Sequence, residues 1–95
     1  MRPDGAWYTT IAPGASRLFR GRHYRRVAMT DGRVIVTTRR GTVLLDAATS
    51  DLELTSVRGG LLLQVLATDS SSVTHVFEFR PRHRAAGRAL AGALG

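Results

Sequence analysis

The sequence contains no cysteine, which excludes a disulfide framework and any metal site built on thiolates. It also lacks a long apolar run: the longest, Leu61 to Ala67, is interrupted by Gln64. A helix that spans a bilayer needs about 18 such residues, so we expect no transmembrane segment. No apolar run follows the first arginine, so we expect no signal peptide. We therefore expect a cytoplasmic protein, one that can also reside peripherally at a membrane.

Lysine is absent as well, so all fourteen basic residues are arginine, against seven acidic residues, and the net charge is +7. A GC-rich genome accounts for arginine in place of lysine, but not for where the arginines lie. Residues 1–41 hold nine arginines and two acids, residues 42–79 hold one arginine and five acids, and residues 80–95 hold four arginines and no acid. If the fold brings the two basic ends together, they form one positive surface.

The dominant pattern in the chain is an alternation of apolar and polar residues, interrupted by turn residues, which predicts short strands. The stretch YRRVAMTDGRVIVTTRRG, residues 24–41, predicts a hairpin, because Asp31-Gly32 suits a type I′ turn. The residues that favour strands fall in seven segments: Ala6–Ile11, His23–Met29, Arg33–Arg39, Thr42–Leu45, Leu52–Val57, Leu61–Thr68 and Val73–Arg80. Residues 61–68 are almost wholly apolar, which is typical of a strand buried on both faces or covered by a helix.

The pattern becomes helical after Pro81, a residue that suits the first turn of a helix. One predicted apolar face consists of Ala86, Ala89, Leu90, Ala93 and Leu94. Two glycines, Gly87 and Gly92, weaken the helix but would let it lie close to a sheet. We therefore predict a single mainly β domain over residues 1–95, a seven-stranded antiparallel split barrel or bent sheet with one C-terminal helix. Its parts are an N-terminal strand and basic loop (1–22), antiparallel strands (23–80) and the helix (81–95).

The hairpin VAMTDGRVIVTTRRGTVLL resembles the hairpin of bacterial pleckstrin-homology-like (PH-like) and GRAM-like domains. The later segment GGLLLQVLATDSSSVTHVFEF and the small-residue helix are similar to the rest of such a domain. The resemblance implies a bent sheet capped by the helix, and a module that docks lipid headgroups, peptides or other proteins and can assemble into rings. The phosphoinositide-binding members carry basic residues around the first hairpin, and Arg17, Arg20 and Arg22 of RLFRGR are arranged similarly.

The densest basic cluster in the sequence is the candidate anion-binding site. It contains Arg17, Arg20, Arg22, His23, Arg25 and Arg26. We add Arg39 and Arg40 from the next turn, and Arg82 and Arg84 from the start of the helix, where free N–H groups favour anions. Arginine suits phosphate because its planar guanidinium donates two parallel hydrogen bonds. The alternative is a solvated basic loop that binds nothing.

No catalytic pattern accompanies these arginines. The three histidines show no metal-ligand spacing, and the serines at 70–72 are turn residues without an activating neighbour. Among apolar neighbours, His75 is expected to be a buried, hydrogen-bonded core residue, and Val73, Phe77 and Phe79 to be core residues. We therefore expect no enzyme, no metal and no cofactor.

The sequence thus predicts a binding or scaffold module that docks an anionic partner, either a membrane lipid headgroup or an acidic protein surface, through its arginines. Two alternatives remain. The first is self-assembly into a homo-oligomer through unpaired sheet edges. The second is nucleic-acid binding driven by phosphate contacts, which is less favoured because only Phe19 and Tyr24 offer aromatic rings near the arginines.

Overall fold

The computed structural model describes residues 4–13 and 23–95. Seven antiparallel strands form one sheet in the order β4-β3-β2-β1-β7-β6-β5. The strands are β1 (Asp4–Ile11), β2 (His23–Thr30), β3 (Arg33–Thr37), β4 (Val43–Ala48), β5 (Leu52–Arg58), β6 (Leu63–Asp69) and β7 (Thr74–Phe79). Two 3₁₀ turns, η2 (Thr49–Asp51) and η3 (Pro81–His83), precede β5 and the helix α1 (Arg84–Leu94). The prediction of a mainly β chain with seven antiparallel strands and one C-terminal helix is confirmed.

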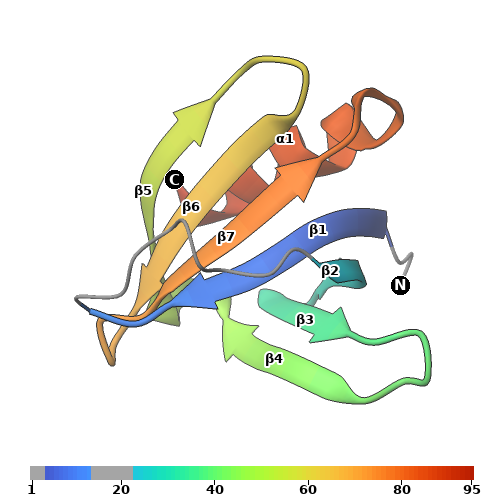
Figure 1. Ribbon diagram of the computed structural model, residues 1–95. Coiled ribbons are helices and arrows are strands. Elements are labelled where there is room, and N and C mark those ends of the chain that lie inside the picture. The colour runs from blue at the N-terminus through green and yellow to red at the C-terminus, as the bar shows by residue number, and fades with distance from the viewer. Residues whose placement is uncertain (1–3, 14–22) are drawn as a thin grey trace.

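The sheet is strongly bent (Figure 1): β3 and β4 lie below, β5, β6 and β7 lie above, and β1 connects the two parts. This connection depends on β1, which pairs with β2 along one side and with β7 along the other. Strands from the two ends of the sequence therefore become neighbours. The end of β7 and the turn η3 that follows it lie beside β1 for the same reason.

The turn between β2 and β3 is the one that the sequence predicts. Asp31 and Gly32 both have positive φ angles, 49° and 72°, as a type I′ turn requires. The register then pairs Val27 with Val36 and Met29 with Val34. This pairing places the apolar residues of both strands on the core face.

The core lies inside the bend of the sheet. Its largest fully buried side chains are Phe77, Phe79, Leu90, Val34, Val36 and Val65. The prediction that β6 is buried on both faces is confirmed, because the consecutive residues Val65, Leu66 and Ala67 are each at most 2% exposed. The predicted start of this strand is wrong: Leu61 lies in the preceding loop and is 84% exposed. Val73 is only half-buried, whereas Phe77 and Phe79 are core residues as predicted.

Helix α1 closes the core against β5, β6 and β7 (Figure 1). Its packed face consists of Ala86, Gly87, Leu90, Ala91 and Leu94. The prediction that Ala89 and Ala93 belong to this face is wrong, because both are exposed. Alanine and glycine occur on all sides of this helix, so the spacing of the alanines does not identify the face that packs on the sheet. Gly87 does allow close packing on the sheet, but an added Cβ at Gly92 would meet nothing within 4 Å.

Candidate anion-binding site

Tyr24 is the centre of a cluster on the face of the sheet that points away from the core. It lies directly opposite Trp7 in the pairing of β1 with β2, and the two rings meet edge to face at 5.6 Å and 81°. The Tyr24 ring extends diagonally over Gly5, so closely that a Cβ on Gly5 would lie 1.7 Å from the phenol oxygen. Glycine at this position therefore makes room for the ring. The phenol oxygen lies 3.4 Å from Nε2 of His83, in η3.

Arg80 joins the cluster from the end of β7. Its guanidinium carbon lies 5.4 Å from the centre of the Trp7 ring and 5.2 Å from the centre of the Tyr24 ring. Both distances are within the range of a cation–π interaction. The two rings therefore fix the position of this cation. Two sequence segments more than fifty residues apart meet here because β1 separates β2 from β7 by a single strand.

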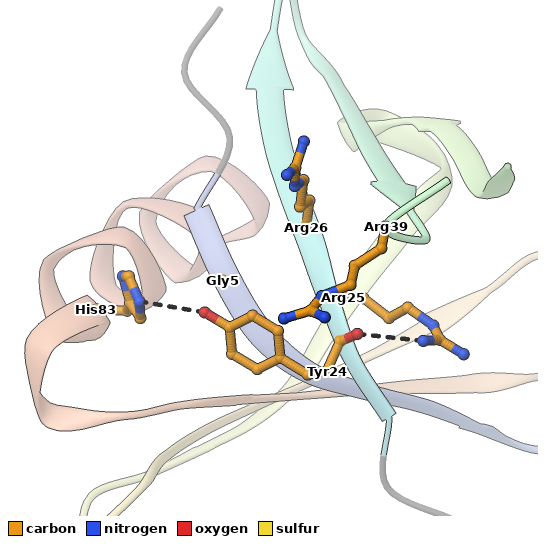
Figure 2. A pocket seen from close by; sticks show the side chains of 6 residues that line it. All are labelled: Gly5, Tyr24, Arg25, Arg26, Arg39 and His83. Carbon is orange, nitrogen blue, oxygen red and sulfur yellow. Dashed lines mark hydrogen bonds between the residues drawn. The ribbon is translucent and has the colours of Figure 1, made fainter. Parts of the chain in front are cut away.

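A cavity of about 440 Å³ opens beside Tyr24. It is lined by Gly5, Tyr24, Arg25, Arg26, Arg39 and His83. Figure 2 shows Arg39 extending from the turn after β3 toward the Tyr24 ring, whereas Arg25 points away from that ring. A neighbouring hollow of about 390 Å³ is lined by Tyr24, Arg39 and Arg80. Tyr24 and Arg39 line both hollows, so the two hollows lie beside the same two side chains.

The arginines of this site have no acidic partner. Within residues 4–13 and 23–95, the side chains of Arg26, Arg39 and Arg80 form no ion pair and no hydrogen bond. Arg33 on β3 shows the contrast, because its Nε donates to Asp46 Oδ1 at 2.8 Å. Glu78 lies opposite Trp7 in the pairing of β1 with β7. It is only 5% exposed, accepts from Gln64 Nε2 at 3.4 Å, and is not among the described residues that line either cavity.

We refer to Trp7, Tyr24, Arg26, Arg39 and Arg80 as the Tyr24 face. Arg39 and Arg80 line one hollow without an acidic partner among the described residues. Such cations repel one another, and an anion between them relieves this repulsion. The Tyr24 face therefore has the charge, the hydrogen-bond donors and the hollow shape that an anionic group requires.

Three of the predicted site residues, Arg17, Arg20 and Arg22, lie outside the described residues. His23 is exposed at the start of β2, beside a smaller cavity of about 270 Å³. Arg25 lines both that cavity and the one at Tyr24. Its Nη1 donates to the Tyr24 carbonyl at 3.1 Å, and its Nε is buried without a hydrogen-bond partner.

The remaining predicted arginines lie apart from the Tyr24 face. Arg40 is exposed in the turn after β3, and Arg82 is exposed in η3. Neither lines the cavities around Tyr24. Arg84 donates through Nη2 to the carbonyl oxygens of Gly60 and Leu61, the latter at 3.4 Å. It therefore fastens the loop between β5 and β6 to the start of the helix, and we leave it out of the site.

Sequence reasoning missed Trp7 and Arg80 and did not include Tyr24 among the site residues. Alternation in residues 73–80 does place Glu78 and Arg80 on one face of a strand. However, the neighbour of that strand cannot be read from the alternation. The pairing of β1 with β7, which brings the end of β7 beside Trp7, could not be predicted from the sequence.

A second polar network lies inside the fold and confirms the prediction for His75. The imidazole accepts from the Tyr8 hydroxyl at Nδ1 and donates from Nε2 to Asp69 Oδ2, both at 2.8 Å. An ionised carboxylate can only accept, so Nε2 carries a hydrogen, and in the neutral imidazole Nδ1 is then the acceptor. The other carboxylate oxygen of Asp69 accepts from the backbone N–H groups of Ser71 (2.8 Å) and Val73 (3.1 Å). The network thus ties the β6–β7 turn to β1.

Two pKa values reflect this network. Burial, with a further contribution from the negative charge of Asp69, raises the pKa of Tyr8 to about 12. The hydrogen bond from His75 is the main reason that the pKa of Asp69 is lowered. The N–H groups of Val73 and Ser71 act in the same direction, and burial opposes them. Tyr8 is therefore a neutral donor, which fits a structural role.

Among the described residues, no group of three or more His, Asp or Glu side chains could hold a metal ion. The described part of the chain also has no helix with the length and hydropathy needed to cross a bilayer. No protein-family model matches the sequence, and no curated protein matches it.

Proposed function

We propose that this chain is a non-enzymatic binding module that docks on anionic membrane surfaces through the Tyr24 face. The observation that carries the proposal is that Arg39 and Arg80 line one hollow with Tyr24, beside Arg26 in the adjoining cavity, and have no acidic partner among the described residues. Near an anionic membrane, each such cation contributes about 1 kcal/mol. Trp7 and Tyr24 add aromatic rings of the kind that favour the interface between lipid and water. The residues on this face are exposed or half-buried, so a surface can reach them.

The resemblance to PH-like and GRAM-like domains supports the same function. Such domains dock headgroups or protein partners without catalysis. A bent antiparallel sheet with a terminal helix against its core agrees with that expectation. The absence of a metal cluster in the described residues adds no argument for or against an enzyme.

Vesicle co-sedimentation tests the proposal. The unaltered chain is expected to sediment with phosphatidylcholine vesicles that contain phosphatidylserine, and not with phosphatidylcholine alone. Arg39→Ala should weaken binding about fivefold, the effect of losing about 1 kcal/mol. Arg58→Ala is the matched control, since Arg58 lies on β5 at the far end of the sheet and its loss lowers the net charge equally.

Two results would contradict membrane docking. One is binding that does not depend on the anionic lipid. The other is an equal loss of binding in Arg39→Ala and Arg58→Ala, because the whole protein's charge rather than the Tyr24 face would then be responsible. Binding to an acidic protein but not to vesicles would replace the membrane with a protein partner.

A second candidate function is self-association, and the edge strand β4 favours it. β4 ends the sheet, and its first two residues, Val43 and Leu44, are 55% and 45% exposed. Unpaired edges with apolar side chains are sites for pairing with another strand. Sedimentation velocity of the unaltered chain and of Leu44→Arg tests this candidate: oligomers that Leu44→Arg dissociates support it, and a monomer at all concentrations removes it.

A further inference from the structure

We infer that the Tyr24 face binds a phosphate monoester, the doubly charged end of a lipid headgroup, between the guanidinium groups of Arg80 and Arg39. This inference rests on the proposed function and names the ligand class of the same site. A site for a phosphate monoester differs from a general positive surface, to which any anionic lipid would bind.

The first argument is the way in which Arg80 is held. Its guanidinium lies over the Trp7 and Tyr24 rings and forms no hydrogen bond within the described residues. These ring contacts supply no oxygen or nitrogen acceptor, so the guanidinium N–H groups have no acceptor among the described residues. Arg80 is therefore fixed in position with its donors free. A planar guanidinium with two free donors is suited to two oxygens of one phosphate.

The second argument is the charge that the hollow presents. Arg39 and Arg80 line the same hollow around Tyr24, and Arg26 lines the adjoining cavity. A single carboxylate or phosphodiester brings one negative charge, which leaves two guanidiniums partly uncompensated. A phosphate monoester carries about −1.5 to −2 at neutral pH and has three terminal oxygens. It therefore balances two cations and gives each of them an oxygen to bind.

The third argument is size. The two hollows that share Tyr24 and Arg39, of about 390 and 440 Å³, each have the volume that small ligands occupy. A hollow of this kind holds one compact group. An extended polyanion such as nucleic acid requires a groove that continues along several phosphates. A headgroup phosphate that enters this hollow keeps its acyl chains in the membrane beside the exposed guanidiniums of the Tyr24 face.

The test compares vesicles that contain phosphatidic acid, a monoester, with vesicles that contain phosphatidylserine, a diester, at equal zeta potential. The unaltered chain is expected to bind the monoester vesicles on the order of tenfold more tightly, the effect of one additional charged hydrogen-bonded pair. Arg80→Lys retains the charge but loses the planar donor pair. It should remove the preference, because it weakens binding to phosphatidic acid vesicles more than binding to phosphatidylserine vesicles. Arg58→Lys is the matched control and should keep the preference.

Each outcome has a definite meaning. Equal binding of the unaltered chain to both vesicles overturns the monoester inference but leaves membrane docking intact. No binding to either vesicle removes both proposals. A preference that persists in Arg80→Lys overturns the role of Arg80. Arg39→Lys provides a second variant for the case in which Arg80→Lys does not fold.

A soluble competitor distinguishes the two sources of the phosphate group. Glycerol 3-phosphate, added at constant ionic strength, should displace the chain from phosphatidic acid vesicles, with chloride as the control. Trp7 is the only tryptophan in the chain, so its fluorescence reports this site during the titration. Displacement with a saturable fluorescence change supports recognition of the monoester itself. Displacement equal to that by chloride contradicts a monoester site.

Discussion

Gly87 of helix α1 packs directly on the ring of Phe79 in β7. A Cβ built on Gly87 would lie 2.7 Å from Phe79 Cδ2 and 2.7 Å from Leu63 Cδ2. Both neighbours are fully buried core residues that cannot move aside cheaply. This contact sets the distance between the helix and the sheet.

Gly87→Ala is therefore expected to destabilise the protein, although alanine is the better helix former. Overpacking of a core costs about 1–3 kcal/mol, and the gain in helix propensity is about 1 kcal/mol. The net effect is a fall of up to about 2 kcal/mol in the free energy of unfolding, which a urea titration measures. Gly92→Ala is the control, since its Cβ meets nothing, and should raise stability by up to about 1 kcal/mol. Equal effects of the two substitutions would contradict this packing.

Tyr8→Phe should remove a hydrogen bond from the interior and leave His75 Nδ1 without its donor. The expected loss is about 1–3 kcal/mol at neutral pH. The raised pKa of Tyr8, about 12 against 10.0, also means that the folded chain holds this proton more tightly than the unfolded chain. The contribution of Tyr8 to stability is thus complete below pH 10 and decreases as pH rises toward 12. Denaturant titrations across that range should show the decrease in the unaltered chain and in Tyr24→Phe, but less of it in Tyr8→Phe.

The lowered pKa of Asp69 predicts that the free energy of unfolding depends on pH in the acidic range. Its pKa is below the ordinary value of 3.8, so the folded chain binds this proton less readily than the unfolded chain. The contribution to stability is present above pH 3.8 and is lost as pH falls through the lower folded-state value. Asp69→Asn should be less stable than the unaltered chain at neutral pH and should lose less stability on acidification. Parallel pH profiles of the two proteins would contradict this role of Asp69.

Gly5→Ala should impair the candidate site more than the fold. The added Cβ would occupy the place of the Tyr24 hydroxyl, and the ring at the end of a flexible side chain can turn away. The ring would then leave Arg80, so we expect weaker binding to phosphatidic acid vesicles with a change in stability below about 1 kcal/mol. Gly59→Ala is the control, because its Cβ meets nothing within 4 Å. Unchanged vesicle binding in Gly5→Ala would remove Tyr24 from the site.

Local patterns in the sequence predicted most of the fold. Alternation identified all seven strands, and Asp31-Gly32 identified the tight turn, because both features depend only on neighbouring residues. The failures lie where local pattern is ambiguous. Leu61 continues an apolar run yet lies in a loop, and the alanines at 89 and 93 fit helical spacing yet face solvent.

The candidate site was less predictable than the fold. Arg26 and Arg39 were found because arginines are conspicuous in the sequence. Arg80 and Trp7 were not, because their proximity depends on β1 lying between β2 and β7, a long-range pairing that alternation does not specify. Composition also could not separate Arg84, which donates to backbone carbonyls, from the arginines that have no hydrogen-bond or ion-pair partner in the described part of the chain.

The most direct test of membrane docking is an NMR measurement with vesicles that contain phosphatidylserine and a spin-labelled lipid. The label broadens the amide signals of residues that approach the membrane. Docking through the Tyr24 face predicts broadening at Trp7, Tyr24, Arg26, Arg39 and Arg80, and sharp signals along β5. Broadening centred on Val43 and Leu44 or on β5, or no broadening at all, would contradict it.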